Sequence, residues 1–204
     1  MAVTINGTTG IAGASWTTSG RPASPVSGQQ GYNTTLKALE VYINASWRIM
    51  AEGFTATGGT ITTDGSYTVH SFTSSGTFTP SSAGTVEYLV VAGGGGRGKE
   101  AYYGGGGGAG GFLTATDFAV AATGLTVTIG AGGAESLNGT GADGSDSVFS
   151  SITADGGGGG AFPDQVGNNG GSGGGGGGND SARAGGSATA GQGNNGGASQ
   201  TSSA

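Results

Sequence analysis

The residues that could carry chemistry in this chain are few, and most of them adjoin glycine runs. Gly93 to Lys99 follows the apolar stretch Val86 to Ala92 and nearly matches Gly-x-x-x-x-Gly-Lys, a loop that wraps nucleotide phosphates. Glu100 stands where Ser or Thr would hold magnesium, and residues 101–103 lead into five glycines instead of a helix that could face a phosphate. We therefore expect a surface loop here, and no nucleotide or other cofactor.

A second segment resembles part of a calcium-binding repeat. Gly141 to Val148 follows the pattern Gly-Gly-x-Gly-x-Asp-x-apolar, except that Ala142 replaces the second glycine. Calcium in such proteins lies between stacked copies of the repeat, and this chain has one copy. Asp143 and Asp146 are the metal candidates, and the competing interpretation, which we favour, is a turn that their side chains stabilise.

Catalytic groups form no recognisable set. The chain has no cysteine, which excludes thiolate metal sites and cysteine nucleophiles. His70 is the single histidine, and no serine with a supporting carboxylate stands at a familiar spacing from it, so we expect a structural histidine. No pair of carboxylates is marked out for acid–base work. We expect a protein that is not an enzyme.

Composition limits the partners. The 204 residues include 51 glycines, and a net charge of −6 with few basic residues argues against nucleic acid, because binding phosphates requires clustered Lys and Arg. No apolar run is long enough for a membrane helix, and the N-terminus lacks the pattern of a secretory signal. We expect a soluble protein that does not insert into membranes and is not exported by a cleaved signal.

Glycine is concentrated in the second part of the chain. Residues 1–92 hold 12 glycines and residues 93–204 hold 39, so a boundary in composition falls near Ala92. We expect an N-terminal β-element for attachment and trimerisation at residues 1–50, a β-rich connecting region at 51–92, and a glycine-rich distal domain at 93–204.

The first part indicates short strands with little helix. Alternating apolar residues on both sides of Asn44-Ala45-Ser46 predict a hairpin over residues 38–50, although the same apolar residues also fit helical spacing. Further strands are expected at 60–63, 67–72, 76–79 and 86–92, and strand-like inserts among the glycines at 111–114, 125–129 and 147–152.

The glycine runs cannot build an ordinary core, because glycine buries no side chain and loses much backbone entropy on ordering. Their backbone groups can instead pair with neighbouring segments, as in extended helices with three residues per turn. We expect packed helices of the polyglycine II type, and thus a mainly β fold of hairpins or a small sandwich followed by this glycine-rich domain. The alternative is a flexible linker or tail, which applies most to residues 161–204.

The order of these segments resembles the glycine-rich domain of bacteriophage tail-fibre and receptor-binding proteins. The resemblance runs over residues 70–160, from Ser71-Phe72-Thr73 through Val86 to Ala92, Val127 to Gly133, and Asp146 to Gly160. Separately, Arg21 to Thr34, followed by Leu39 to Tyr42 and Trp47, is similar to a short β-element of phage virion surface proteins.

The resemblance implies a structural virion protein, made in the host cytoplasm and placed on the particle surface. It implies a homotrimer, contact with other virion proteins through residues 1–50, and a distal domain that binds a host surface glycan or outer-membrane protein. A tail-fibre or fibre-tip adhesin is the favoured hypothesis. A capsid fibre, decoration or adaptor protein with a purely structural role is the alternative.

Receptor contact is expected from the aromatic and polar residues that interrupt the glycine runs. Tyrosine and arginine suit this role because each joins an apolar body to fixed polar groups. The competing interpretation is that these residues only cap or space the runs. The candidates are Arg97, Lys99, Glu100, Tyr102, Tyr103, Phe162, Pro163, Asp164, Gln165, Asn179, Asp180 and Arg183.

Overall fold

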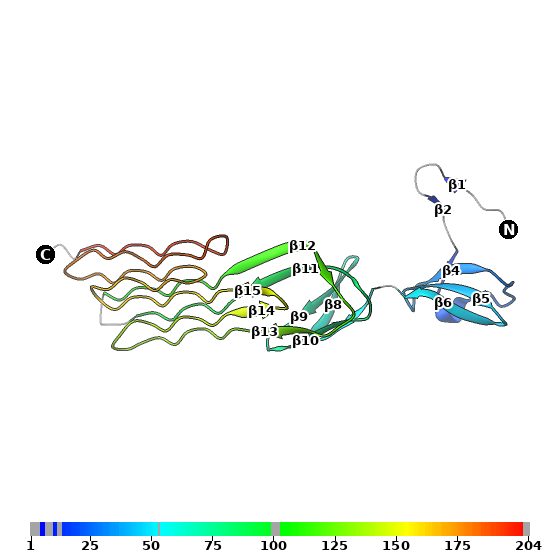
Figure 1. Ribbon diagram of the computed structural model, residues 1–204, viewed down its shortest axis with the longest axis horizontal. Helices are drawn as coiled ribbons and strands as arrows, with labels where there is room; N and C mark the ends of the chain where they lie inside the picture. The colour runs from blue at the N-terminus through cyan, green and yellow to red at the C-terminus, as the bar shows by residue number, and fades with distance from the viewer. Residues whose placement is uncertain (1–4, 7–9, 12–13, 53, 99–102, 202–204) are drawn as a thin grey trace. The chain divides into compact units, whose positions relative to one another are not determined.

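The computed structural model describes residues 5–6, 10–11, 14–52, 54–98 and 103–201. It is mainly β, as expected, and it divides into two compact units, Met1–Thr55 and Ala56–Ala204 (Figure 1). The β-rich residues 56–92 belong to the same unit as the glycine runs, because their strands pair and pack with strands that lie between those runs. Among the described residues, no helix has the length and apolar character needed to cross a bilayer.

The first unit is a small sheet. Its main strands lie in the order β3-β4-β5-β6, and only β3 and β4 run parallel. The β5–β6 hairpin confirms the predicted hairpin, and the helical alternative is wrong, because Asn44 and Ala45 adopt the positive φ values that suit a tight two-residue turn. The elements are β1 (Ile5–Asn6), β2 (Gly10–Ile11), β3 (Ser15–Trp16), a 3-10 helix (Thr18–Gly20), β4 (Gln30–Asn33), β5 (Ala38–Ile43) and β6 (Ser46–Glu52).

A buried carboxylate organises this sheet. Glu40 is 1% exposed and accepts hydrogen bonds from Trp16 Nε1 at 3.0 Å, Asn33 Nδ2 at 2.9 Å and the guanidinium of Arg21. The hydrogen bond from Arg21 is the main reason that the pKa of Glu40 is lowered to about 2, and the bonds from Asn33 and Trp16 act in the same direction. The segment resembling a phage surface element therefore has a polar centre.

The second unit contains a small β-sandwich. A five-stranded sheet, in the order β15-β14-β13-β10-β7, lies against the β11–β12 ribbon, and β8 and β9 form a separate hairpin. The strands are β7 (Ala56–Thr57), β8 (Thr60–Asp64), β9 (Tyr67–Ser71), β10 (Gly76–Pro80), β11 (Gly84–Val91), β12 (Phe112–Val120), β13 (Leu125–Thr128), β14 (Ser147–Phe149) and β15 (Ile152–Ala154).

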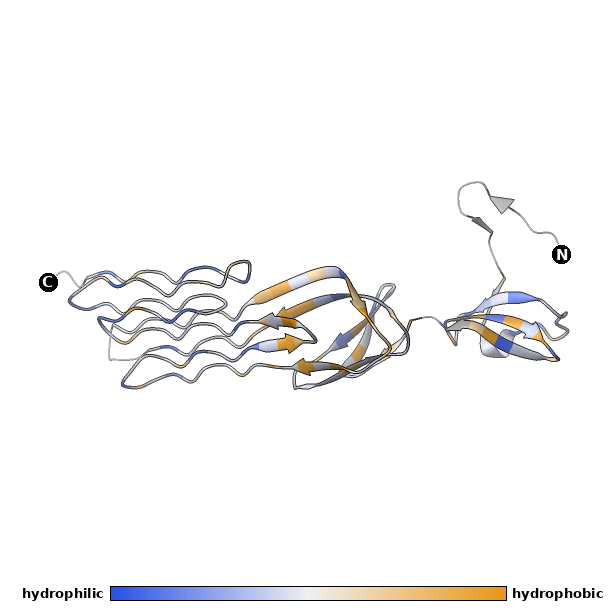
Figure 2. Cartoon of the chain, in the orientation of Figure 1, coloured by the Kyte–Doolittle hydropathy of each residue, from blue (hydrophilic) through white to orange (hydrophobic). Residues whose placement is uncertain are grey.

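Apolar side chains fill the space between the ribbon and the sheet. Val90, Ala92 and Ala154 are buried there, and Tyr88, Leu113, Phe149 and Ile152 pack against them. Aromatic rings add edge contacts, such as Phe78 to Phe149 with ring centroids 5.9 Å apart. Figure 2 shows the apolar colour along these strands and its absence from most of the glycine part. The conventional core of this unit thus ends where the glycine runs begin.

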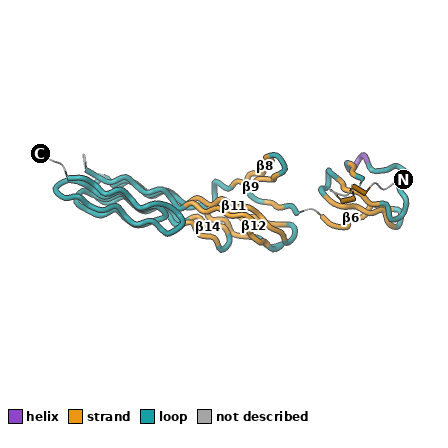
Figure 3. The backbone as a smooth tube through the Cα atoms, turned by 90° about the horizontal axis from the view of Figure 1, so that it is seen from above, coloured by secondary structure: helices purple, strands orange, loops and turns teal. Residues whose placement is uncertain are grey.

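Extended glycine-rich segments continue from the sandwich and lie side by side (Figures 1 and 3). We call them the glycine bundle. A flexible tail was the alternative for residues 161–201. They contribute segments to the bundle through backbone hydrogen bonds, such as the one from Gly173 N to Asn194 O. The segments cover residues 93–98, 104–111, 130–137, 140–147, 155–162, 165–171, 172–180, 183–188 and 192–200.

Hydrogen bonds between these segments repeat every three residues. In segment 93–98, the amides of Gly93 and Gly96 donate to one neighbour, at Ser145 O and Ala142 O. The amides of Gly95 and Gly98 donate to a different neighbour, segment 104–111, at Gly108 O and Gly105 O. A period of three is the one expected for an extended helix with three residues per turn. The assignment to polyglycine II helices stays a prediction, which this period supports.

Residues 156–161 form the centre of the bundle, and all six are buried. Their amides donate to backbone carbonyls of other segments or to the carboxylates of Asp143 and Asp146. Their packing leaves no room for side chains on most glycines. A Cβ on Gly158 would lie 2.0 Å from the carbonyl oxygen of Asn168, and one on Gly160 would lie 2.0 Å from that of Gly105. Glycine is therefore required by the close approach of neighbouring backbones.

Candidate functional site in the loops of the glycine bundle

Loops from distant parts of the chain meet at the end of the bundle that lies away from the sandwich. We call them the apical loops, and their described parts are residues 97–98 with 103, 135–140, 162–165, 178–183 and 199–201. Antiparallel segments reverse direction there between residues 137 and 140, 162 and 165, and 180 and 183, and the last described segment ends at the same place (Figure 1). Direct contacts join neighbouring loops, beginning with the amide of Gly178, which donates to the carbonyl of Tyr103 at 3.0 Å.

Asp164 holds two of these loops together. Its Oδ1 accepts hydrogen bonds from the amides of Asp180 and Ser181, each at 3.1 Å, and its Oδ2 lies 3.4 Å from Asn179 Nδ2. Its φ of 57° is in the left-handed region, which aspartate adopts more readily than most residues. Asp164 therefore fixes the position of the 178–183 loop, which carries Arg183.

Further contacts link the remaining loops. Arg97 Nε lies 2.8 Å from Glu135 Oε2, in an ion pair whose side chains are about half exposed. Thr140 donates from Oγ1 to Gln165 Oε1 at 2.8 Å. The amide of Arg183 donates to Ser199 Oγ at 2.8 Å, so the last described segment also reaches this end. The apical loops thus form one connected surface and not a set of separate tips.

The structure brings together most of the predicted contact residues. Arg97, Tyr103, Gln165, Asp180 and Arg183 are exposed there, and Phe162, Asp164 and Asn179 are partly buried, whereas Pro163 is buried. Lys99, Glu100 and Tyr102 lie outside the described residues.

Sequence reasoning missed residues 135–140 and 199–201. They interrupt no long glycine run, so composition alone did not mark them, and only the pairing of segments places them at this end.

The chemistry of this surface is mixed. It offers a guanidinium at Arg183, carboxylates, amides, and apolar groups at Tyr103 and Leu137, which are 42% and 61% exposed. Such a combination suits contact with sugars or with a protein surface.

The calcium candidates have another role. Asp143 Oδ1 accepts hydrogen bonds from the amide of Gly159 at 2.7 Å and from Asn168 Nδ2 at 2.8 Å, and Asp146 Oδ1 accepts from the amide of Gly156 at 2.8 Å. Among the described residues, no group of three or more His, Cys, Asp or Glu could hold a metal ion. These two carboxylates act as acceptors for the amides of buried glycines.

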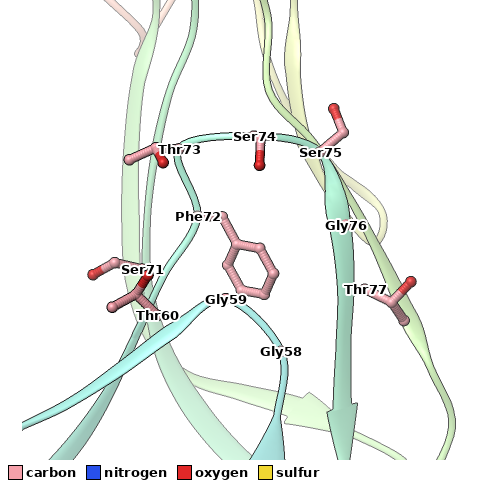
Figure 4. Close-up of a pocket in the computed structure, with 10 residues that line it drawn as sticks. All are labelled: Gly58, Gly59, Thr60, Ser71, Phe72, Thr73, Ser74, Ser75, Gly76 and Thr77. Atoms are coloured by element: carbon pink, nitrogen blue, oxygen red, sulfur yellow. The ribbon is translucent and has the colours of Figure 1, made fainter.

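His70 and a shallow hollow lie on the sandwich. His70 Nδ1 is 2.8 Å from the carbonyl of Gly58, and its ring packs against Phe78 with centroids 5.1 Å apart, as a structural histidine would. Beside it, a hollow of about 300 Å³ surrounds the ring of Phe72 and has a rim of Ser and Thr hydroxyls (Figure 4). The ten residues that line this hollow carry no ionisable side chain, so they supply no general acid or base.

Fold and site together define a glycine-rich β-protein whose loops lie at the end of a bundle held by backbone hydrogen bonds. A family model described as a glycine-rich domain matches residues 72–204, about two thirds of the chain. The chain belongs to this glycine-rich domain family. Comparison with curated proteins and with solved structures found no match for the chain.

Proposed function

We propose that the chain is a structural protein of a bacteriophage virion, and that it acts as a tail-fibre or fibre-tip adhesin which attaches to the host cell surface. The observation that supports this proposal is the meeting of the apical loops at one end of the glycine bundle. The phage context comes from the resemblance over residues 70–160 and in the N-terminal β-element.

The bundle suits an adhesin because it separates scaffold from contact surface. Buried backbone hydrogen bonds hold the segments, as at Gly157 to Gly93 and Gly160 to Gly96. The exposed residues of the loops lie outside that packing, so they can differ in sequence without loss of the scaffold. Contact with a glycan or an outer-membrane protein falls to exposed side chains such as Tyr103, Gln165 and Arg183.

The first unit serves assembly in this proposal. Residues 1–50 attach the chain to other virion proteins and form a homotrimer. The glycine-rich unit then supplies several copies of the apical loops on one particle. Several weak contacts would give firm attachment, because linked sites raise each other's effective concentration.

Adsorption of phage with altered apical loops tests the proposal. The double variant Tyr103→Ala/Arg183→Ala removes an aromatic and a cationic side chain, and Thr123→Ala, in the exposed turn between β12 and β13, is the matched control. We expect the double variant to lower the adsorption rate constant by at least about tenfold, since interface anchors of these types cost about 2 kcal/mol or more when truncated. The number of complete particles stays unchanged, and the control adsorbs normally.

Normal adsorption by the double variant would refute the adhesin proposal. Loss of complete particles, with normal adsorption by those that form, would instead favour the alternative of a purely structural capsid fibre, decoration or adaptor protein.

A further inference from the structure

The hollow on the sandwich has an aromatic ring at its centre and polar groups around it (Figure 4). We call it the Phe72 hollow. Two parts of the chain line it, residues 58–60 at the turn into β8 and residues 71–77 from the end of β9 into β10. Its volume of about 300 Å³ is at the low end of the range for small-molecule sites, so it has room for one small ring and not for an extended ligand.

Glycines contact the edge of the aromatic ring. Cβ atoms on Gly58 and Gly59 would lie 3.1 Å from atoms of the Phe72 ring, and one on Gly76 would lie 3.4 Å from its Cε1. Phe72 is half-buried, and Figure 4 looks onto one face of its ring, over which no other lining side chain lies. Phe78 packs against other rings, whereas Phe72 contacts no ring in the described part of the chain. One face of the Phe72 ring is therefore available to a ligand.

Contacts outside the hollow hold its walls. His70 Nδ1 donates to the carbonyl of Gly58 at 2.8 Å, and the φ values of Gly58 and Gly59, 110° and 65°, lie in the left-handed region that favours glycine. On the other side, Ser75 Oγ accepts a hydrogen bond from the amide of Ile129 at 3.0 Å. The hollow is therefore formed before any ligand binds, and the single histidine of the chain helps to position its wall.

The loop of residues 72–75 carries polar groups that the chain does not use. None of its backbone amides and carbonyls forms a hydrogen bond within the described residues. Figure 4 shows the Ser74 side chain pointing from this loop toward the ring, whereas Ser75 and Thr77 point away from it. Residues 73–75 are exposed, so water occupies these groups in the free chain, and the hydroxyls of a ligand can replace that water.

The chemistry of the lining selects a neutral ligand. It has no ionisable side chain, so it offers no opposite charge to an anion or a cation. A flat apolar surface beside polar groups is complementary to a pyranose, whose C–H groups form an apolar face and whose hydroxyls project from the edge. The face of an aromatic ring is electronegative, and it attracts the weakly positive C–H hydrogens of such a sugar.

We propose that the Phe72 hollow binds a neutral pyranose, the terminal sugar of a glycan. One face of the sugar lies on the Phe72 ring, and its hydroxyls bond to the loop of residues 72–75 and to Ser74 Oγ. The hollow shares no residue with the apical loops, so this site is additional to the contact surface of the proposed function. It also does not depend on the phage context, because the argument uses only the ring, the loop and the absence of charge.

An NMR titration of the full chain, labelled with ¹⁵N-glycine, tests the proposal with the methyl glycosides of glucose, galactose and N-acetylglucosamine. We expect the amide signals of Gly58, Gly59 and Gly76 to shift saturably with at least one of the three. The expected dissociation constant is about 1–10 mM, which a ligand of about 13 non-hydrogen atoms reaches at ordinary ligand efficiency. Sorbitol, which has the hydroxyls of a sugar but no ring, should cause no saturable shift.

Two substitutions identify the groups that bind. Phe72→Leu keeps an apolar side chain but removes the flat ring, and it should weaken binding about fivefold. Ser74→Ala, at an exposed residue, should weaken binding about threefold through the loss of one hydrogen bond. Thr123→Ala, which lies outside the hollow, is the matched control and should have no effect. Unchanged amide signals of Gly156 to Gly160 show that the fold of each variant is intact.

Absence of saturable shifts at Gly58, Gly59 and Gly76 with all three glycosides would overturn the proposal. So would shifts that sorbitol reproduces, or binding that neither Phe72→Leu nor Ser74→Ala weakens. Adsorption of phage with altered apical loops is a separate measurement, so either site can fail without the other.

Discussion

Two adjacent glycines separate the effect of position from the effect of composition. Gly106 and Gly107 lie in the same run and are both exposed. A Cβ on Gly107 would lie 2.0 Å from the carbonyl oxygen of Gly95, whereas a Cβ on Gly106 would meet no atom within 4 Å. Alanine at Gly107 should therefore lower the free energy of unfolding, and alanine at Gly106 should raise it.

The magnitude for Gly107→Ala follows from the hydrogen bonds that must yield. Ordinary contact begins near 3.4 Å, so segment 93–98 must move by 3.4 − 2.0 = 1.4 Å relative to its neighbour. That movement breaks the bonds from Gly95 to Gly108 and from Gly98 to Gly105, which are 2.8 and 3.1 Å long. At about 1.5 kcal/mol each, the free energy of unfolding falls by about 3 kcal/mol.

Gly106→Ala should stabilise the unit. Its φ is not in the left-handed region, so alanine adopts the native backbone and reduces the entropy of the unfolded chain, a gain of about 0.4–1 kcal/mol. At about 2–4 °C per kcal/mol, we predict that the Tm falls by about 6–12 °C for Gly107→Ala and rises by about 1–4 °C for Gly106→Ala.

Differential scanning calorimetry measures both shifts. Trp16 and Trp47 are the two tryptophans and both lie in the first unit, so tryptophan fluorescence follows that unit separately and should not change. Equal destabilisation by the two substitutions would refute the reasoning, because it would mean that the run needs glycine for its backbone freedom and not for close approach at particular positions.

Three further predictions concern carboxylates. Glu40→Gln should destabilise the first unit by about 3 kcal/mol, because it leaves a buried partner of Arg21 uncharged. The lowered pKa of Glu40 stabilises this unit above the ordinary carboxyl pKa near 4.5, and this stability is lost as the pH falls toward 2. Acid titration followed by tryptophan fluorescence should show the loss in the native chain and not in Glu40→Gln. Asp143→Ala should lower the free energy of unfolding by about 2 kcal/mol, as calorimetry can measure. Calcium or EDTA should leave the Tm of the native chain unchanged. A rise in Tm with calcium would contradict the acceptor role. Asp164→Ala should speed amide exchange at Asp180 and Ser181 and leave residues 156–161 unaffected, as NMR can test.

The sequence predicts the strands well because their side chains carry the pattern. The β5–β6 hairpin follows from alternation around a polar turn, and the strand at 86–92 from a run of β-formers that β11 reproduces. Strand β12 extends to Val120, beyond the predicted insert at 111–114. Its later residues form a long ribbon with β11, and small residues such as Ala115 and Ala119 gave little local sign of it.

The arrangement of the glycine bundle could not be predicted from the sequence. Glycines are alike, so nothing in a run tells which segment its amides will reach or in what register, and the meeting of the apical loops depends on that register. The polar centre of the first unit was missed because Trp16, Arg21, Asn33 and Glu40 are far apart in sequence. A charged Glu40 between the apolar residues Leu39 and Val41, within a predicted strand, was the available signal.

Amide hydrogen exchange at the glycines tests the central claim, that the runs are held by backbone hydrogen bonds between segments. In a sample with ¹⁵N-labelled glycine, the account predicts that the amides of Gly156 to Gly160 exchange only as fast as the unit unfolds. Gly94 and Gly106, which are exposed, should exchange quickly. Exchange of all these glycines at the rate of an unfolded chain would contradict the account.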